Sequence, residues 1–192
     1  MLKNKINSDK LLSFFSIIPL HPNHITIISV ITAIFAFFIF YYDPLISIVL
    51  FCLSFFIDAL DGVVARAKNL ISKKGAFLDG ISDRLVEFIL LLLLILNFGS
   101  DQLLLICFTF TLFFGTCMTS FIKAYSHHQG LLSEKDSKKM SGILERAERV
   151  ILLIITYILL IYYPIYSLYS AVLIAIFSFI TFIQRLFYIL SK

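Results

Sequence analysis

The chain has 192 residues, of which 60% are hydrophobic and 15% are charged, and its formal net charge is +4. Soluble domains are close to half apolar and about one quarter charged, so this composition excludes an ordinary soluble domain and indicates a membrane protein. We expect the positive charge to attract anionic lipids or anionic substrates, and we do not expect a nucleic-acid partner.

The N-terminal segment, residues 1–22, is predicted to form an amphipathic helix on the membrane surface. Lysines such as Lys3 and Lys10 would lie near lipid headgroups while the apolar side chains enter the membrane. A frayed basic tail is the alternative. We do not expect a signal peptide, because Pro19 and Pro22 interrupt the apolar run and no small-residue cleavage site follows it.

Six apolar segments follow in chain order, and each is long enough to cross a bilayer as a helix of about 20 residues. They comprise residues 25–42, 45–67, 77–97, 102–126, 143–163 and 165–190. The sequence therefore predicts an all-α membrane protein with six transmembrane helices in a single domain over residues 1–192.

The distribution of lysine and arginine predicts how these helices are oriented. All 16 basic residues lie in the N-terminal segment, in residues 66–84, in residues 123–149 or near the C-terminal end, and the other connections contain none. By the positive-inside rule these regions face the cytoplasm. We therefore expect a multi-pass protein of the cell membrane with both termini in the cytoplasm.

The cysteines and the adjacent histidines are not expected to bind metal. Cys52, Cys107 and Cys117 lie within apolar helices without a C-x-x-C spacing, so we expect packing residues and neither a disulfide nor a zinc site. His127 and His128 begin a polar loop. Adjacent histidines without further ligands nearby are more often solvated than bound to a metal ion.

Four aspartates interrupt two of the apolar segments in the stretch "FIDALDGVVARAKNLISKKGAFLDGISDRL". Asp58 and Asp61 are three residues apart in one predicted helix, and Asp79 and Asp83 are four apart in the next. Each pair projects as a unit, and the pairs can face each other because the helices are antiparallel. Carboxylates at that depth need partners, and Mg²⁺ prefers carboxylate oxygens. Four carboxylates could hold two metal ions, an arrangement suited to phosphoryl chemistry.

Small and cationic residues lie between these aspartates. Gly62 and Ala65 leave room for a ligand beside the acids, and Arg66 can bind a phosphate with its guanidinium fork. Gly75 can supply a turn where the chain re-enters the membrane. The structural alternative is that the acids pair with Arg66, Arg84 and nearby lysines at the interface, but such pairing needs neither small residues nor this regular spacing.

The spacing Asp58-x2-Asp61-Gly62-x2-Ala65-Arg66-x8-Gly75-x3-Asp79-x3-Asp83 resembles the complete signature of the CDP-alcohol phosphotransferases. The resemblance implies a metal-dependent membrane transferase, which moves the phosphatidyl or archaetidyl group of a CDP-lipid to the hydroxyl of a small alcohol and releases CMP. It also implies two Mg²⁺ or Mn²⁺ ions in each site and a homodimer.

The resemblance further implies a role for each signature residue. Asp58, Asp61 and Asp79 would coordinate metal, and Asp83 would contact the second metal and act as the catalytic base on the incoming hydroxyl. The residues that would hold the CDP-lipid are Asp61, Gly62, Ala65, Arg66 and Gly75, joined by Pro22, Asn23 and Thr26 of the stretch "HPNHIT". A Pro-Asn helix start explains that short stretch equally well.

Cationic residues outside the signature are expected to select the acceptor. They interrupt apolar runs near the predicted cytoplasmic ends of the last three segments, and they are Lys123, Arg146, Arg149 and Arg185. Cations beside a metal site suit an acceptor that carries a phosphate, although each alone could snorkel to headgroups. The stretches "SFIKA", "GILERAER" and "QRL" resemble the phosphatidylinositol phosphate synthases and their archaeal counterparts that act on CDP-archaeol. That resemblance implies inositol 1-phosphate as the acceptor.

Three further acids are interpreted as supports of the site. Glu87 lies one turn deeper in the membrane than Asp83 and would join the network around the metal ions. Glu145 and Glu148 would hold the arginines in place.

Two alternatives stay open at this point. The same chemistry could use glycerol 3-phosphate, serine or free inositol as the acceptor. A divalent-cation transporter or proton relay is more distant, because the outer halves of the segments, such as "TAIFAFFIF" and "LLLLILNF", contain almost no polar group to carry an ion onward. The lipid could be CDP-diacylglycerol or CDP-archaeol, because no residue pattern in the sequence distinguishes one kind of apolar lipid tail from the other.

Overall fold

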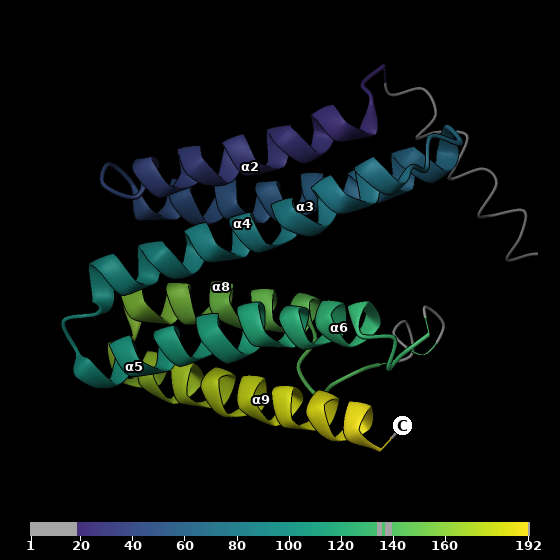
Figure 1. The fold of residues 1–192 in the computed structure, drawn as a ribbon. Helices are drawn as coiled ribbons and strands as arrows, with labels where there is room; N and C mark the ends of the chain where they lie inside the picture. The colour runs from purple at the N-terminus through teal and green to yellow at the C-terminus, as the bar shows by residue number, and fades with distance from the viewer. Residues whose placement is uncertain (1–18, 134–135, 137–139, 192) are drawn as a thin grey trace, which may run out of the picture. The chain divides into compact units, whose positions relative to one another are not determined.

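The computed structural model describes residues 19–133, 136 and 140–191, which form helices and connecting turns without a strand. In chain order the helices are α2 (Pro22–Ile39), α3 (Pro44–Ala67), α4 (Lys73–Phe98), α5 (Gln102–Phe110), η1 (Thr111–Met118), α6 (Thr119–His128), α8 (Arg146–Tyr162) and α9 (Pro164–Leu190) (Figure 1). The prediction of an all-α protein is confirmed. The predicted surface helix over residues 1–22 falls almost entirely outside the described residues.

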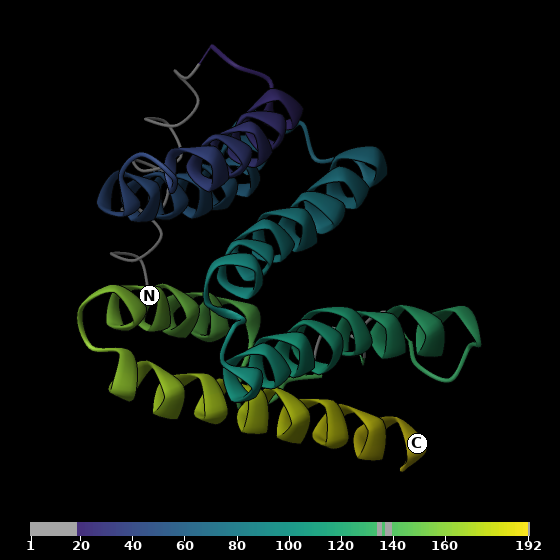
Figure 2. The same ribbon diagram turned by 90° about the vertical axis from the view of Figure 1, so that its left-hand side faces the viewer.

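The chain forms two compact units, Met1–Ile89 and Leu90–Lys192, and the boundary between them falls within α4. In the first unit α2 and α3 lie antiparallel and side by side, as Figures 1 and 2 show from two directions. In the second unit α9 packs against α8 and against the continuous stretch formed by α5, η1 and α6. The single domain expected over residues 1–192 stays a prediction.

Prolines and aspartates determine where several helices begin. Pro22, Pro44 and Pro164 occupy the first turns of α2, α3 and α9, where a missing N–H costs no helical hydrogen bond. Asp43 caps α3, because its Oδ1 accepts hydrogen bonds from backbone N–H groups two and three residues later at 2.8 and 3.1 Å. Asp101 caps α5 in the same way.

Small buried residues allow α2 and α3 to approach closely. Ser47 Oγ donates to the carbonyl of Ala36, and Ser54 Oγ donates to the carbonyl of Ser29, each at 2.7 Å. A hydroxyl can reach the backbone of a neighbouring helix only where both helices present small side chains, as membrane helices often do. This close packing fixes α3, and with it the two aspartates of that helix, against the first turns of α2.

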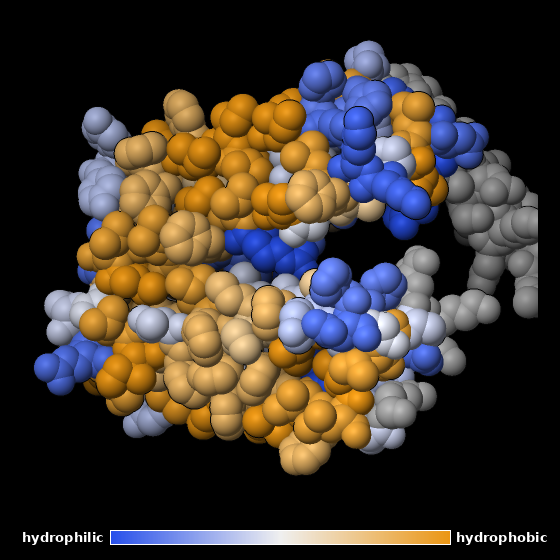
Figure 3. Space-filling view, in the orientation of Figure 1, coloured by the Kyte–Doolittle hydropathy of each residue, from blue (hydrophilic) through white to orange (hydrophobic). Residues whose placement is uncertain are grey.

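Among the described residues, four stretches are long and apolar enough to cross a membrane: Pro22–Ile39, Pro44–Ala67, Gln102–His128 and Pro164–Leu190. Their outward faces carry large hydrophobic side chains, and hydrophilic residues gather where α3 ends and α4 begins (Figure 3). The first half of α4 is rich in charge, and α8 has 17 residues. The count of six spans therefore stays a prediction for α4 and α8.

Candidate active site

Three carboxylates from α3 and α4 converge in the first unit. Asp58, Asp61 and Asp79 each offer one oxygen, and these oxygens lie within 4.8 Å of one another. Asp58 and Asp61 are buried, and Asp79 is half-buried. Carboxylates at such separations repel one another, and burial removes the water that would screen them. The group therefore suits a compensating cation.

The chemistry of these donors fits a hard divalent ion. The cluster contains carboxylate oxygens, which Mg²⁺, Mn²⁺ and Ca²⁺ prefer, and no cysteine or histidine among the described residues belongs to it. The hydroxyl of Thr26 in α2 donates a hydrogen bond to Oδ2 of Asp61. This bond orients the carboxylate from outside the cluster, as supporting hydrogen bonds do in metal sites.

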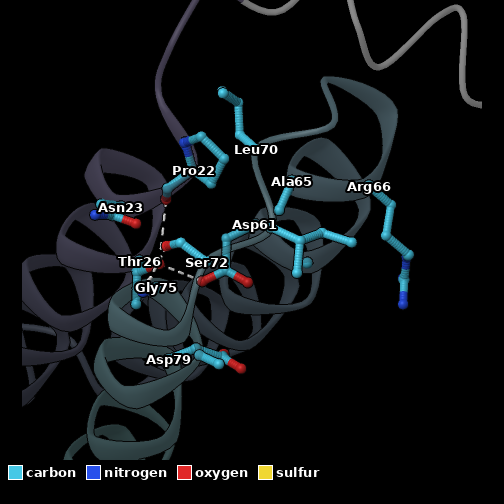
Figure 4. A pocket seen from close by; sticks show the side chains of 13 residues that line it. Pro22, Asn23, Thr26, Asp61, Ala65, Arg66, Leu70, Ser72, Gly75 and Asp79 are labelled. Atoms are coloured by element: carbon cyan, nitrogen blue, oxygen red, sulfur yellow. Dashed lines mark hydrogen bonds between the residues drawn. The ribbon is translucent and has the colours of Figure 1, made fainter.

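A pocket of about 220 Å³ opens beside Asp61 and Asp79 (Figure 4). Its lining includes all eight residues that the sequence predicts to hold the CDP-lipid, namely Pro22, Asn23, Thr26, Asp61, Gly62, Ala65, Arg66 and Gly75. Two carboxylates and apolar surface meet in this pocket, and Arg66 belongs to its lining with its side chain directed away from both aspartates (Figure 4). The pocket can therefore receive a ligand that combines an anionic group with an apolar portion.

The turn between α3 and α4 forms one wall of the pocket. Asn69 follows the last turn of α3 and adopts the left-handed backbone conformation, with φ 56°. A left-handed residue at this position ends the helix and turns the chain toward α4. Ser72 Oγ then accepts a hydrogen bond of 3.0 Å from the N–H of Gly75 and caps α4. A Cβ atom at Gly75 would lie 3.1 Å from Ser72 Oγ and 3.3 Å from Asn23 Oδ1, so a side chain there would crowd this wall.

Three residues of this turn also line the pocket and were not predicted from the sequence: Leu70, Ile71 and Ser72. Ser72 carried a usable signal, because a serine directly before a lysine-rich helix start is a common N-cap. Leu70 and Ile71 have no comparable feature in the sequence that would place them in the pocket. Their presence in the pocket depends on the reversal at Asn69, which the sequence did not reveal.

Asp83 and Glu87 lie further along α4. Asp83 is outside the group of three converging carboxylates, its side chain is 18% exposed, and Oδ2 lies 3.3 Å from Nη1 of Arg84. Glu87 is buried. The predicted roles of Asp83 as the catalytic base and fourth ligand, and of Glu87 as a network member, stay predictions.

The four cations predicted to bind the acceptor all belong to the second unit. Lys123 lies in α6, Arg146 and Arg149 begin α8, and Arg185 lies near the end of α9. Arg149 and Arg185 are buried, and the other two are half-buried. Their convergence with the aspartates of the first unit stays a prediction.

Both buried arginines lie along the stretch formed by η1 and α6. A Cβ atom at Gly115 would lie 3.1 Å from Cδ of Arg149, and Nη1 of Arg185 donates to the carbonyl of Thr119 at 3.0 Å. Gly115 and Thr119 are one turn apart. The two guanidinium-bearing side chains therefore meet the same helix at successive turns.

The predictions that Glu145 and Glu148 hold the arginines in place have different outcomes. Oε2 of Glu145 accepts a hydrogen bond of 2.7 Å from Nη2 of Arg185, so this part of the prediction is confirmed. Glu148 is exposed and forms no ion pair with any residue that the structure describes, so its predicted contact is wrong. The loop histidines, His127 and His128, are exposed.

A family comparison identifies the class of enzyme. The CDP-alcohol phosphatidyltransferase family matches residues 19–183 of the chain, which include every aspartate of the site and three of the four predicted acceptor cations, Lys123, Arg146 and Arg149. The chain belongs to this family. It is therefore a transferase and a multi-pass membrane protein, as its sequence predicted.

Two curated relatives within this family are archaeal. The archaetidylinositol phosphate synthase of Pyrococcus horikoshii is 35% identical over 144 residues, which cover 72% of this chain and 66% of the relative. The archaetidylinositol phosphate synthase of Aeropyrum pernix is 32% identical over 152 residues, which cover 79% of this chain and 73% of the relative.

Two solved structures have the same fold as this chain. Phosphatidylinositol phosphate synthase of Mycobacterium tuberculosis with CDP-DAG bound has a TM-score of 0.75 and 24% identity, covering 96% of this chain and 94% of the other. The same enzyme in complex with manganese and citrate has a TM-score of 0.76, also at 24% identity, covering 96% of this chain and 89% of the other. This likeness shows that the chain has the fold of that synthase.

Proposed function

We propose that this phosphatidyltransferase moves the phosphatidyl or archaetidyl group of a CDP-lipid to inositol 1-phosphate and releases CMP. The observation that carries the proposal is a cluster of three carboxylates, two of which line a pocket that also contains all the residues predicted to hold the CDP-lipid. The names of the curated relatives support inositol phosphate as the acceptor.

The aspartates would bind the ions on which the reaction depends. The residues that would hold two divalent ions are Asp58, Asp61, Asp79 and Asp83. When bound, Mg²⁺ or Mn²⁺ would polarise the diphosphate and stabilise the charge of the departing CMP. Support for Mn²⁺ comes from the manganese complex of the Mycobacterium tuberculosis synthase, and support for a hard ion comes from the donor set.

The first unit would position the diphosphate for displacement. Arg66 on the wall of the pocket can bind phosphate oxygens with its guanidinium, and Thr26 orients the carboxylate of Asp61. The acceptor hydroxyl would attack the lipid-side phosphorus in line with the oxygen of CMP. As the new P–O bond forms and the bond to CMP breaks, Asp83 would take the hydroxyl proton.

The second unit would bind the phosphate of the acceptor. The cations proposed for this role are Lys123, Arg146, Arg149 and Arg185. Arg185 supports the proposal, because it is buried and its Nε donor has no hydrogen-bond partner among the described residues. A phosphate held by two or more such groups would fix the attacking hydroxyl within reach of the phosphorus.

The proposed setting is the cytoplasmic side of the cell membrane. The clustering of lysine and arginine supports a cytoplasmic active site and cytoplasmic termini. We further propose a homodimer, and CDP-archaeol or CDP-diacylglycerol as the lipid substrate. CDP-DAG bound to the Mycobacterium tuberculosis synthase supports the diacyl lipid, and the archaeal relatives support the ether lipid.

The test measures CMP release by the purified full-length chain with Mg²⁺. CDP-diacylglycerol and CDP-archaeol are each supplied with inositol 1-phosphate, glycerol 3-phosphate, serine or free inositol. We expect inositol 1-phosphate to give the highest kcat/KM. Preference for glycerol 3-phosphate would keep the phosphate-binding role of the cations but replace the acceptor, and activity confined to serine or free inositol would overturn both.

A further inference from the structure

The guanidinium of Arg185 is held at both of its terminal nitrogens. Nη1 donates to the carbonyl of Thr119 at 3.0 Å, and Nη2 donates to Oε2 of Glu145 at 2.7 Å. Because a guanidinium is planar and rigid, two anchors on different nitrogens fix both the position and the plane of the group. The side chain of Arg185 is 10% exposed and that of Glu145 is 40% exposed, so water reaches the second anchor from the carboxylate side only.

The first anchor comes from a helix with altered geometry. The N–H of Thr119 donates to the carbonyl of Phe114, five residues earlier, as in a π-helix. The carbonyl of Gly115, which that N–H would reach in an α-helix, accepts instead from the hydroxyl of Thr119. Thr119 is thus tied down by both its backbone and its side chain, which makes its carbonyl a fixed acceptor for Arg185.

The second anchor is itself fixed by the loop that leads into α8. Oε1 of Glu145 accepts a hydrogen bond of 2.6 Å from the N–H of Gly142, so one carboxylate joins this loop to Arg185. The N–H of Leu144 donates to Oγ1 of Thr181 in α9 at 2.9 Å, which holds the loop against the helix that carries the arginine. Glu145 therefore cannot follow a displaced Arg185 without breaking contacts of the loop.

The anchored guanidinium keeps hydrogen-bond donors that neither anchor uses. Nε of Arg185 is buried and has no hydrogen-bond partner among the residues that the structure describes. A guanidinium carries five N–H donors, and the two anchors use two of them. The arrangement therefore orients the cation without saturating it, and unused donors stay available to an anionic ligand.

We propose that Glu145 is a positioning residue, which holds Arg185 in the orientation that binds the phosphate of the acceptor. The proposal rests on the proposed function of the four cations. Glu145 touches neither substrate in this account and acts only through Arg185. Its removal is then expected to weaken binding of the phosphorylated acceptor while the CDP-lipid binds as before.

The test uses the full-length enzyme with Glu145→Gln, which keeps the size of the side chain and removes its charge. We expect the KM for inositol 1-phosphate to rise about tenfold, as for loss of one charge-assisted hydrogen bond, with kcat and the KM for the CDP-lipid close to wild type. Glu145→Asp keeps the charge and should give a smaller rise. The matched control is Glu148→Gln, three residues further on at an exposed position, which should leave both KM values unchanged.

A double-variant cycle separates positioning from general destabilisation. If Glu145 acts through Arg185, Glu145→Gln should add no further rise in acceptor KM to an Arg185→Ala enzyme. Additive effects, or an unchanged KM in both Glu145 variants while Arg185→Ala raises it, would overturn the positioning role. An unchanged acceptor KM in Arg185→Ala itself would instead contradict the proposed function of the arginine. If Glu145→Gln does not fold, the Glu145→Asp variant decides the cycle.

Discussion

The aspartate site of the first unit and the four predicted acceptor cations of the second differ in how their residues are distributed along the chain. The aspartates lie within 26 residues, from Asp58 to Asp83, on two consecutive helices. The cations come from three helices, and Arg185 and its partner Glu145 are 40 residues apart. The short connection between α3 and α4 can bring Asp58, Asp61 and Asp79 together, whereas the contacts of Arg185 depend on tertiary hydrogen bonds.

This difference separates two parts of the proposed function. The aspartate site and its pocket carry groups suited to metal and diphosphate, which every reaction of this family would need. The cations and their supports would determine which alcohol is accepted. If this division is correct, changes in the first unit should reduce turnover with any acceptor, and changes in the second should act through the acceptor.

Removal of divalent metal tests the first unit most strongly. We expect a chelator to abolish CMP release with every acceptor, because the three carboxylates would then lie together without the charge that compensates them. Added Mg²⁺ or Mn²⁺ should restore the activity. Full activity in the chelator would show that the aspartates serve only to stabilise the fold.

The variant Asp83→Asn removes the proposed base and keeps the shape of the side chain. We expect kcat to fall by about 10²- to 10⁴-fold, the usual contribution of general base catalysis, with little change in binding of the CDP-lipid. Turnover under saturating substrates, together with direct binding of the CDP-lipid, measures the two effects. Wild-type turnover would exclude Asp83 as the base.

The variant Gly115→Ala tests the second unit at the π-helix. A Cβ atom there would lie 2.8 Å from Oγ of Ser178 and 3.1 Å from Cδ of Arg149, so the methyl group must displace one of them. We expect about a tenfold rise in acceptor KM with an unchanged KM for the CDP-lipid. Gly80→Ala is the control, because its nearest neighbour, Nη1 of Arg84, would lie 4.0 Å away. An equal effect of both variants would contradict the account.

The smallest expected effect comes from Thr26→Val, which removes the hydroxyl that donates to Asp61 and also contacts the carbonyl of Pro22 within α2. Loss of one hydrogen bond to a charged group should lower kcat/KM by about tenfold or less and raise the metal concentration needed for half-maximal rate. Thr26→Ser should restore both. Thr32→Val is the control, because the hydroxyl of Thr32 donates only to the carbonyl of Ile28 within α2. A metal requirement unchanged in Thr26→Val would show that Asp61 needs no such support.

The sequence predicted the helices because apolar runs of about 20 residues and prolines at helix starts are local features. The predicted segment 45–67 agrees closely with α3 (Pro44–Ala67), and 165–190 agrees with α9 (Pro164–Leu190). Most of the residues that line the pocket were predicted from the resemblance to the family, whose signature occupies one short part of the chain. The lining residues come mainly from the start of α2, the end of α3 and the start of α4, which are joined by short connections.

Other features depend on interactions that no local pattern reveals. The π-helix Thr111–Met118 interrupts the predicted segment 102–126, and the stretch contains no proline to mark it. Oε1 of Glu145 accepts from the N–H of Gly142, and a Cβ atom at Gly142 would collide with Thr181 of α9, which is distant in sequence. The sequence predicted equally that Glu145 and Glu148 would contact an arginine. Only the fold shows that Glu145 does so, through Arg185.

The most direct test of the division between the two units is the Arg149→Ala variant, assayed for both substrates. Arg149 is buried beside the π-helix and belongs to the second unit. We predict that the KM for inositol 1-phosphate rises at least tenfold while the KM for the CDP-lipid stays within about twofold of wild type. A rise in the KM for the CDP-lipid with an unchanged acceptor KM would contradict the account.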